Sequence, residues 1–100
     1  MKVAFSKSFE KSVRKLSGKT LESIRRVILE VKNAKDIHQI TDCKQLIRYH
    51  NIYRIRIGDY RAFFSFHIQI VDDEVFFVYL VSRGEAYGKK MESSLKRIDN

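Results

Sequence analysis

Apolar side chains recur along this chain with two different periods, and the change of period divides the sequence into two parts. Between residues 6 and 33 they recur three or four positions apart, which is the period of an amphipathic helix. From Leu46 onward they alternate or run continuously, as they do in strands. The pattern therefore predicts a helical N-terminal part followed by a strand-rich part.

Two helices are predicted in the first part, after a short strand over residues 1–5. Ser6 is a suitable N-cap for the first helix, Gly18 is suited to terminate it, and the second helix begins near Thr20. Because the connection is short, the two helices are expected to form an antiparallel hairpin. Their apolar stripes are Phe9, Val13 and Leu16, and then Leu21, Ile24, Ile28 and Val31. Residues 34–45 are polar and predict a loop with one turn of helix.

Three strands are predicted over residues 52–57, 60–71 and 75–81, all rich in β-branched and aromatic side chains. Turn-forming pairs at residues 58–59 and 72–73 connect them, which predicts an antiparallel meander. The third strand is apolar on both faces, so it is expected to be central and covered on both sides.

A C-terminal helix is predicted from about Glu85, with one apolar stripe along it. The stripe consists of Tyr87, Met91, Leu95 and Ile98. The whole order predicts an α+β fold, in which an N-terminal strand and a helical hairpin pack on a curled antiparallel sheet with a C-terminal helix. A chain of 100 residues is expected to form a single domain over 1–100.

Charge changes this picture by suggesting a partner. Twenty Lys and Arg against twelve Asp and Glu give a formal net charge of +8 and a pI near 9.8. Such an excess favours a polyanionic partner, either nucleic acid or an acidic protein, although solubility alone is the alternative explanation.

The sequence offers no metal or cofactor motif. Cys43 is the only cysteine, so the chain has no internal disulfide and no Cys/His cluster with zinc spacing. The first residues lack the apolar stretch of a signal peptide, and no segment has the eighteen or so apolar residues of a membrane span. We expect a cytoplasmic protein without cofactor.

The predicted strands bring several arginines to one face of the sheet. Side chains alternate between faces along a strand, so Arg54 and Arg56 share a face, and Arg61 joins it from the next strand. If the apolar face packs under the helical hairpin, these arginines converge on the uncovered face, where Arg83 can join them. Guanidinium groups are suited to planar contact with phosphate, whereas an ordinary solvated strand face is the simpler interpretation.

Two segments resemble a known family. Residues 46–61, which read LIRYHNIYRIRIGDYR, resemble the signature motif of the RelE/ParE toxin superfamily of type II toxin–antitoxin systems. Residues 81–87, VSRGEAY, resemble the arginine–tyrosine ending of members that cleave RNA. The predicted order of elements is also similar to the fold of that superfamily along the entire chain.

The resemblance implies a RelE-like mRNA interferase, a ribosome-dependent endoribonuclease that cuts the codon in the A site. It implies cleavage without metal, by attack of the ribose 2′-hydroxyl on the adjacent phosphorus, with translation inhibited as the result. The catalytic side chains it implies are Arg56, Arg61, Arg83 and Tyr87. Basic side chains assigned to RNA binding are Arg54, Arg48, Lys44, Lys89 and Lys90.

The chain departs from the family pattern at the proton-accepting position. The well-studied ribonuclease members carry a lysine pair, of which one lysine is thought to accept the 2′-hydroxyl proton, and this chain has Arg54 and Arg56 there. Arginine is not deprotonated inside proteins. Either Tyr87, His67, His50 or a group of the ribosome is then the base, or catalysis is weaker.

Two other functions remain open. A ParE-like toxin shares the fold and inhibits DNA gyrase by protein contact, but such members generally lack the arginine–tyrosine ending. The other is a toxin homologue that has lost its activity or acts on a different target. All three imply a cognate acidic antitoxin in a toxin–antitoxin hetero-oligomer, covering the basic sheet face or displacing the C-terminal helix. A secondary docking surface for the antitoxin or for ribosomal RNA is the basic face of the helical hairpin, with Lys7, Lys11, Arg14, Lys15, Arg25 and Arg26.

Overall fold

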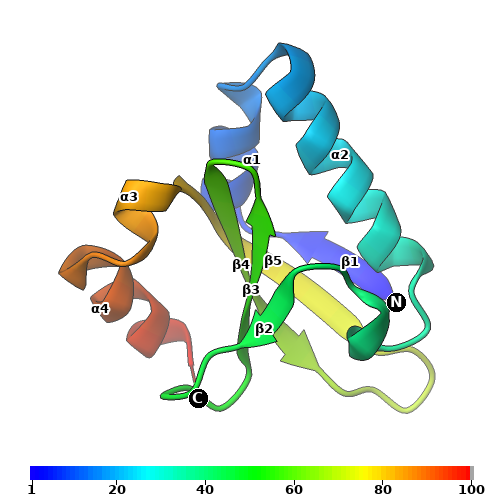
Figure 1. Cartoon of the computed structure of the whole chain (residues 1–100). Helices are drawn as coiled ribbons and strands as arrows, with labels where there is room; N and C mark the ends of the chain where they lie inside the picture. The colour runs from blue at the N-terminus through cyan, green and yellow to red at the C-terminus, as the bar shows by residue number, and fades with distance from the viewer. Residues whose placement is uncertain (100) are drawn as a thin grey trace.

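The computed structural model describes residues 1–99 and contains one five-stranded sheet with helices on both faces (Figure 1). The predicted α+β class is confirmed. The elements in chain order are β1 (Lys2–Phe5), α1 (Lys7–Arg14), α2 (Gly18–Asn33), the 3-10 turn η1 (Ile37–Gln39), β2 (Cys43–Gln45), β3 (Ile52–Ile57), β4 (Tyr60–His67), β5 (Glu74–Ser82), α3 (Arg83–Ala86) and α4 (Lys89–Ile98).

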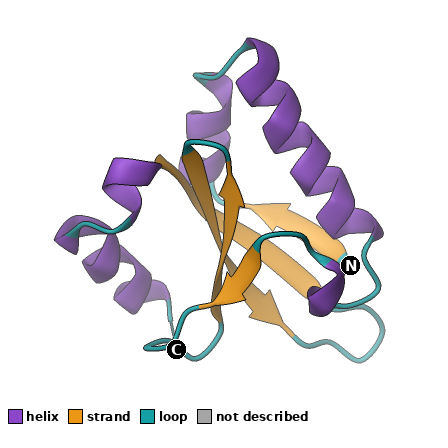
Figure 2. Cartoon of the chain, viewed as in Figure 1, coloured by secondary structure: helices purple, strands orange, loops and turns teal. Residues whose placement is uncertain are grey.

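The sheet has the strand order β1-β5-β4-β3-β2 (Figure 2). All neighbouring strands are antiparallel except β1, which pairs parallel with β5. The meander of three strands was predicted correctly, but β4 rather than β5 occupies the centre. The short strand β2, which adds to the edge beside β3, was not predicted because three polar or mixed residues carry no alternating pattern.

Two apolar clusters lie on opposite faces of this sheet. The larger one joins the hairpin side chains Phe9, Ile24 and Val31 to β3, β4 and β5. The smaller one places Met91 and Leu95 of α4 against the sheet. The face that carries the arginines was expected to be uncovered, and this is wrong for the part that α3 and α4 cover. Apolar sheet residues on that face, Ile52, Phe63 and Val78, need cover, and α3 and α4 provide it.

Strand β5 contributes side chains to both clusters, and a β-bulge in it adds one more to the smaller cluster. Phe63 pairs with Tyr79 and Phe64 pairs with Phe77, which leaves Val78 as an extra residue in β5. Phe77 belongs to the larger cluster, whereas Val78 and Tyr79 both belong to the smaller one. Bulges shift the side-chain alternation in this way. The expectation that this strand is covered on both sides is therefore confirmed.

The strand predicted over residues 60–71 ends at His67, and the following residues form an exposed loop. Ile68, Ile70 and Val71 are all more than four-fifths exposed. Their alternation continues the strand pattern, but no other part of the described chain covers them.

In the helical hairpin, Gly18 was expected to terminate the first helix. It is instead the first residue of α2, with φ of 59°, because α1 has already ended at Arg14.

The C-terminal helix is broken, although the sequence predicted one continuous stripe. Tyr87 and Gly88 separate α3 from α4, so Tyr87 leaves the stripe of Met91 and Leu95 and is 63% exposed. At the other end of α4, Asp99 is nearly buried and accepts backbone hydrogen bonds from His50 and Asn51, at 2.8 and 3.2 Å. These bonds tie α4 to the loop before β3.

None of the helices described is both long and apolar enough to cross a membrane.

Candidate functional site

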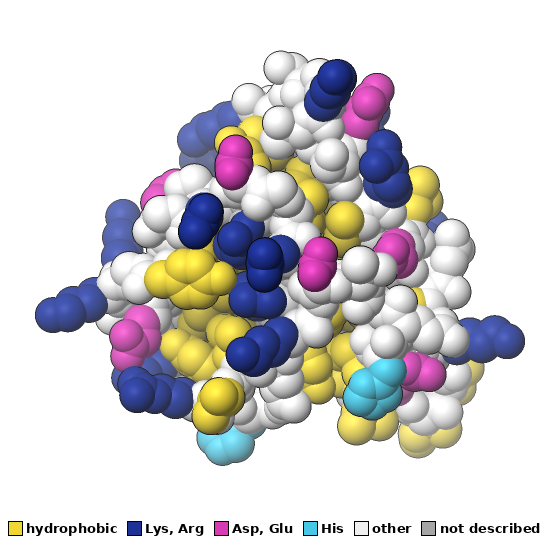
Figure 3. All heavy atoms as spheres, in the orientation of Figure 1, with side chains coloured by type: hydrophobic (Ala, Val, Ile, Leu, Met, Phe, Trp, Pro, Cys, Tyr) yellow, Lys and Arg dark blue, Asp and Glu magenta, His cyan; other side chains and the backbone are white. Residues whose placement is uncertain are grey.

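Four arginines and a tyrosine line one polar hollow on the face that α3 and α4 leave open. Its volume is about 360 Å³, and it opens near the turn between β3 and β4. Basic side chains gather there in the space-filling view, beside a hollowed apolar patch (Figure 3). The lining residues are Arg54, Arg56, Gly58, Arg61, Arg83 and Tyr87.

The β3–β4 hairpin brings three of these arginines together. Arg56 and Arg61 are direct cross-strand partners, and Arg54 lies two residues before Arg56 on the same face. The two-residue turn begins with Gly58, whose φ of 58° favours glycine. Arg83 reaches the same place because its backbone N–H donates to the Asp59 carbonyl at 2.7 Å, which fixes the start of α3 against the turn.

Arg61 is the most enclosed of the four, with only 6% of its surface exposed. Its Nη1 donates to the carbonyls of Gly58 and Tyr60, both at 2.8 Å. Its Nε donates to the Tyr87 hydroxyl at 3.3 Å, and Arg54 Nη1 donates to the same oxygen at 3.4 Å. The guanidinium of Arg61 is therefore held in one orientation, and the Tyr87 oxygen receives hydrogen bonds from two cations.

The charges of the hollow favour anions. None of the four arginines has a carboxylate at ion-pair distance among residues 1–99. Nε of Arg54 is buried and makes no hydrogen bond within that range. The hydrogen bond from Arg61 lowers the pKa of the Tyr87 phenol below its usual value of 10, and Arg54 acts in the same direction against the effect of burial. A phosphate would neutralise this cluster and bind to free guanidinium N–H groups.

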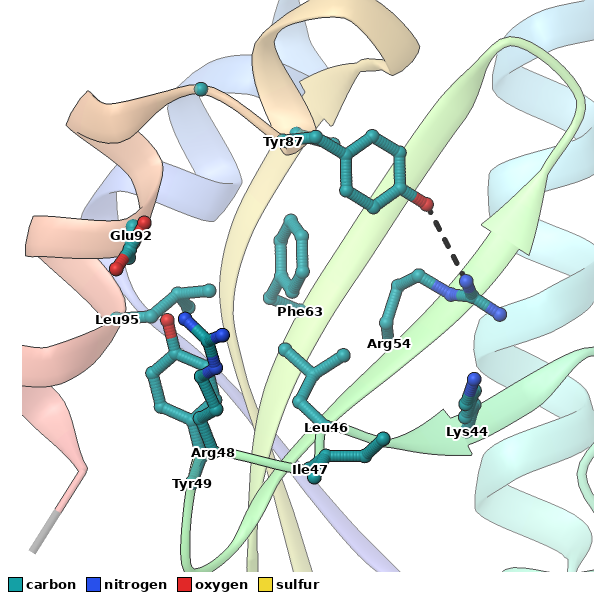
Figure 4. Close-up of a pocket in the computed structure, with 12 residues that line it drawn as sticks. Lys44, Leu46, Ile47, Arg48, Tyr49, Arg54, Phe63, Tyr87, Glu92 and Leu95 are labelled. Atoms are coloured by element: carbon teal, nitrogen blue, oxygen red, sulfur yellow. Dashed lines mark hydrogen bonds between the residues drawn. The ribbon is translucent and has the colours of Figure 1, made fainter.

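An apolar groove adjoins the hollow and shares Arg54 and Tyr87 with it. Figure 4 shows Phe63 between the Tyr87 ring and Leu46, with the side chains of α4 on one side of the groove and Arg54 on the other. The volume of the groove is about 330 Å³. It is lined by Lys44, Leu46, Ile47, Arg48, Tyr49, Arg54, Phe63, Ala86, Tyr87, Gly88, Glu92 and Leu95.

Most of the residues predicted from the sequence lie in these two depressions. The hollow contains Arg54, Arg56, Arg61, Arg83 and Tyr87, and the groove adds Lys44 and Arg48. Lys89 and Lys90 are exposed at the start of α4 and line neither depression.

Two candidate bases are remote from the hollow. His67 lies six residues from Arg61 along β4, which is about 20 Å, and its ring hydrogen-bonds to Ser65. His50 contacts Asp99 at the far end of α4. Sequence reasoning missed the groove, although the apolar pair Leu46–Ile47 beside the basic Arg48 was visible in the sequence.

Comparison with known proteins supports the family resemblance. The chain is 33% identical over 88 residues to toxin RelE3 of Methanocaldococcus jannaschii, covering 87% of this chain and 96% of that protein. The chain belongs to the RelE toxin family. This RelE-family chain matches none of the family models searched.

Solved structures agree with this assignment. The toxin in the RelB–RelE antitoxin–toxin complex of Methanococcus jannaschii superposes with a TM-score of 0.67 at 27% identity, covering 84% of this chain and 94% of that one. A mutant of E. coli toxin RelE in the free state also superposes with a TM-score of 0.67, at 20% identity, covering 97% of this chain and 96% of that one. The latter likeness concerns the fold alone, and it includes the C-terminal helices.

Proposed function

We propose that this toxin is a ribosome-dependent mRNA endoribonuclease and that the arginine-lined hollow binds the phosphate it cleaves. The observation that carries the proposal is the convergence of four guanidinium groups and one phenol, with no carboxylate of residues 1–99 at ion-pair distance from the guanidiniums. Such a cluster is costly in isolation because like charges repel, and a bound phosphate offsets that cost. Membership of the RelE family supports the same reaction.

The reaction is an attack of the ribose 2′ oxygen on the adjacent phosphorus. The 2′-hydroxyl loses its proton, a bond forms from its oxygen to phosphorus, and the bond to the 5′ oxygen breaks, leaving a 2′,3′-cyclic phosphate. The 5′ oxygen takes a proton from solvent. The transition state carries more negative charge on the phosphoryl oxygens than the ground state, and Arg61 and Arg83 stabilise that charge. Arg54 and Arg56 hold the phosphate in place.

Tyr87 is the side chain assigned to accept the 2′-hydroxyl proton. It is the one residue lining the hollow that can lose a proton under ordinary conditions, because the other ionisable groups there are guanidiniums. Its phenolate is stabilised by the hydrogen bonds from Arg61 and Arg54, which lower its pKa. This assignment explains how the reaction can proceed with arginine in place of the lysine pair. The Tyr87 phenol acts as the general base, which the arginines cannot do.

An antitoxin and a place in the cell follow from this proposal. The M. jannaschii relative was solved as a complex of RelE with the antitoxin RelB. By analogy this toxin binds a cognate acidic antitoxin in a hetero-oligomer, and it acts in the cytoplasm, where mRNA is translated. One RelE domain over residues 1–100 is sufficient for the activity, and no cofactor is required.

The test is cleavage of mRNA in a cell-free bacterial translation reaction, with 5′ ends mapped by primer extension. Wild-type protein should cut within codons only when ribosomes are present. The double variant Arg61→Ala/Arg83→Ala should lose the cuts, since removal of one such charge-stabilising group costs about 2.7–4 kcal/mol. The double variant Lys35→Ala/Arg97→Ala removes the same charge from exposed positions outside the hollow and should cut normally. Intact mRNA under wild-type protein would refute the proposal, and gyrase inhibition would then be measured.

A further inference from the structure

The groove beside the hollow has the size and the lining of a binding site for one nucleobase. Its volume of about 330 Å³ lies at the low end of ligand pockets, which span about 300–1,000 Å³. Leu46, Ile47 and Phe63 provide apolar surfaces, and the exposed ring of Tyr87 stands at its border with the hollow (Figure 4). Unstacked bases of single-stranded RNA pack on such surfaces.

Continuity with the hollow identifies the occupant. Arg54 and Tyr87 line both depressions, so a phosphate bound among the arginines has an attached nucleotide within reach of the groove. A peptide would need no phosphate site beside it. The groove therefore fits the base that neighbours the cleaved phosphate, and this step rests on the proposed function.

One charge in the groove does not fit a polyanion. Glu92 is the single carboxylate among the residues lining either depression, where all other charged side chains are Lys or Arg. A carboxylate near bound RNA is repelled by phosphate and costs binding free energy. The cost is offset when the carboxylate accepts hydrogen bonds from N–H groups of the ligand. Bases have such donors, whereas phosphates and uncharged apolar groups have none.

Glu92 is free to change its partner. Its contact is an exposed i,i+4 ion pair with Lys96 at 3.1 Å, and pairs of this kind contribute little to stability. Glu92 also raises the pKa of the Tyr49 phenol, second to burial, which shows that its charge acts on the α4 end of the groove. The carboxylate thus lies on the α4 side of the groove (Figure 4).

We propose that Glu92 is a specificity-determining residue that selects guanine in this groove. Guanine presents two adjacent donors, N1–H and the N2 amino group, which match the two oxygens of a carboxylate. Adenine and cytosine offer one amino group on that edge, and uracil offers one imino group. A good bidentate pair discriminates between bases by a factor of about 5 to 150.

The first test measures binding without ribosomes, using the four nucleoside 5′-monophosphates as probes. The methyl NMR signals of Leu46 and Ile47 report occupation of the groove. GMP should bind at least fivefold more tightly than AMP, CMP or UMP, and Glu92→Gln should remove that preference. The matched control Lys96→Ala breaks the same ion pair but keeps the carboxylate, so it should retain the preference.

The second test uses ribosomes carrying mRNAs that differ in one base of the A-site codon. Cleavage should be fastest with guanine beside the cut, and Glu92→Gln should reduce that advantage without abolishing cleavage. Equal binding of the four nucleotides, or an unchanged GMP preference in Glu92→Gln, overturns the role of Glu92 even if mRNA is still cut. A GMP preference that depends on Glu92, without any cut by wild-type protein, supports the guanine site and refutes the proposed function alone.

Discussion

Replacement of Tyr87 by Phe separates the two roles that this side chain has in the proposed reaction. The variant keeps the ring that borders the groove and removes the oxygen that accepts hydrogen bonds from Arg61 at 3.3 Å and from Arg54 at 3.4 Å. General base catalysis contributes about 10²- to 10⁴-fold, or roughly 3–5 kcal/mol of barrier. We expect the single-turnover cleavage rate to fall by about that factor, while nucleotide binding in the groove changes little.

The pH dependence gives the prediction a sign. The base must be the phenolate, so the wild-type rate should rise as pH rises and level off above the pKa of Tyr87, which Arg61 and Arg54 lower from its usual value of 10. Tyr87→Phe should have a low rate without that rise. The measurement is single-turnover cleavage on programmed ribosomes between about pH 6.5 and 8.5, a range chosen because ribosomes tolerate it.

Tyr79→Phe is the matched control, because it removes a phenol oxygen from β5, outside both depressions. It should keep the rate and pH profile of the wild type. A Tyr87→Phe rate within threefold of wild type, with the same rise, would show that another group accepts the proton.

Two further predictions concern stability. Asp99→Ala should lower the free energy of unfolding by about 1–3 kcal/mol in urea denaturation, because it leaves the backbone N–H groups of His50 and Asn51 without their acceptor; an unchanged midpoint would mean that α4 is held by its apolar contacts alone. Ile70→Ser should change stability by less than about 0.5 kcal/mol, since Ile70 is fully exposed beyond β4. If Ile70→Ser instead lowered the free energy of unfolding as much as a core substitution does, Ile70 would be buried, as in the longer strand that the sequence predicts.

The arrangement of the arginines could be predicted from the sequence because strand geometry is local. Alternation alone places Arg54 and Arg56 on one face, and a two-residue turn places Arg61 directly across from Arg56. The position of Arg83 followed from the length of β5. Each of these positions is set by residues close to it in the sequence, so the sequence pattern is sufficient to predict it.

The groove could not be predicted because it depends on contacts between distant segments. Met91 and Leu95 have ideal spacing to continue a helix through Tyr87, yet the chain breaks at Gly88 and brings Tyr87 to the arginines. Tertiary packing causes the break, because α4 must change direction for its apolar side chains to reach Phe63 on the sheet. The strand prediction failed after His67 for the same reason. Apolar residues alternate there, but a period of two does not show whether another part of the chain packs on them.

The bulge gives β5 one residue more than its pairing with β4 requires. Every residue from Val75 to Val81 is apolar, so a hydropathy profile would hardly register the loss of one of them. Loss of Val78 would nevertheless have a definite effect: the extra residue would disappear and the ladder would become regular, with Tyr79 still opposite Phe63 and Ser82 still opposite Tyr60. The start of α3 would stay against Asp59, and the smaller cluster would lose one buried side chain. For the proposed reaction, in which Arg83 must meet the β3–β4 turn, the bulge is therefore a place where β5 can lose one residue without displacing that arginine.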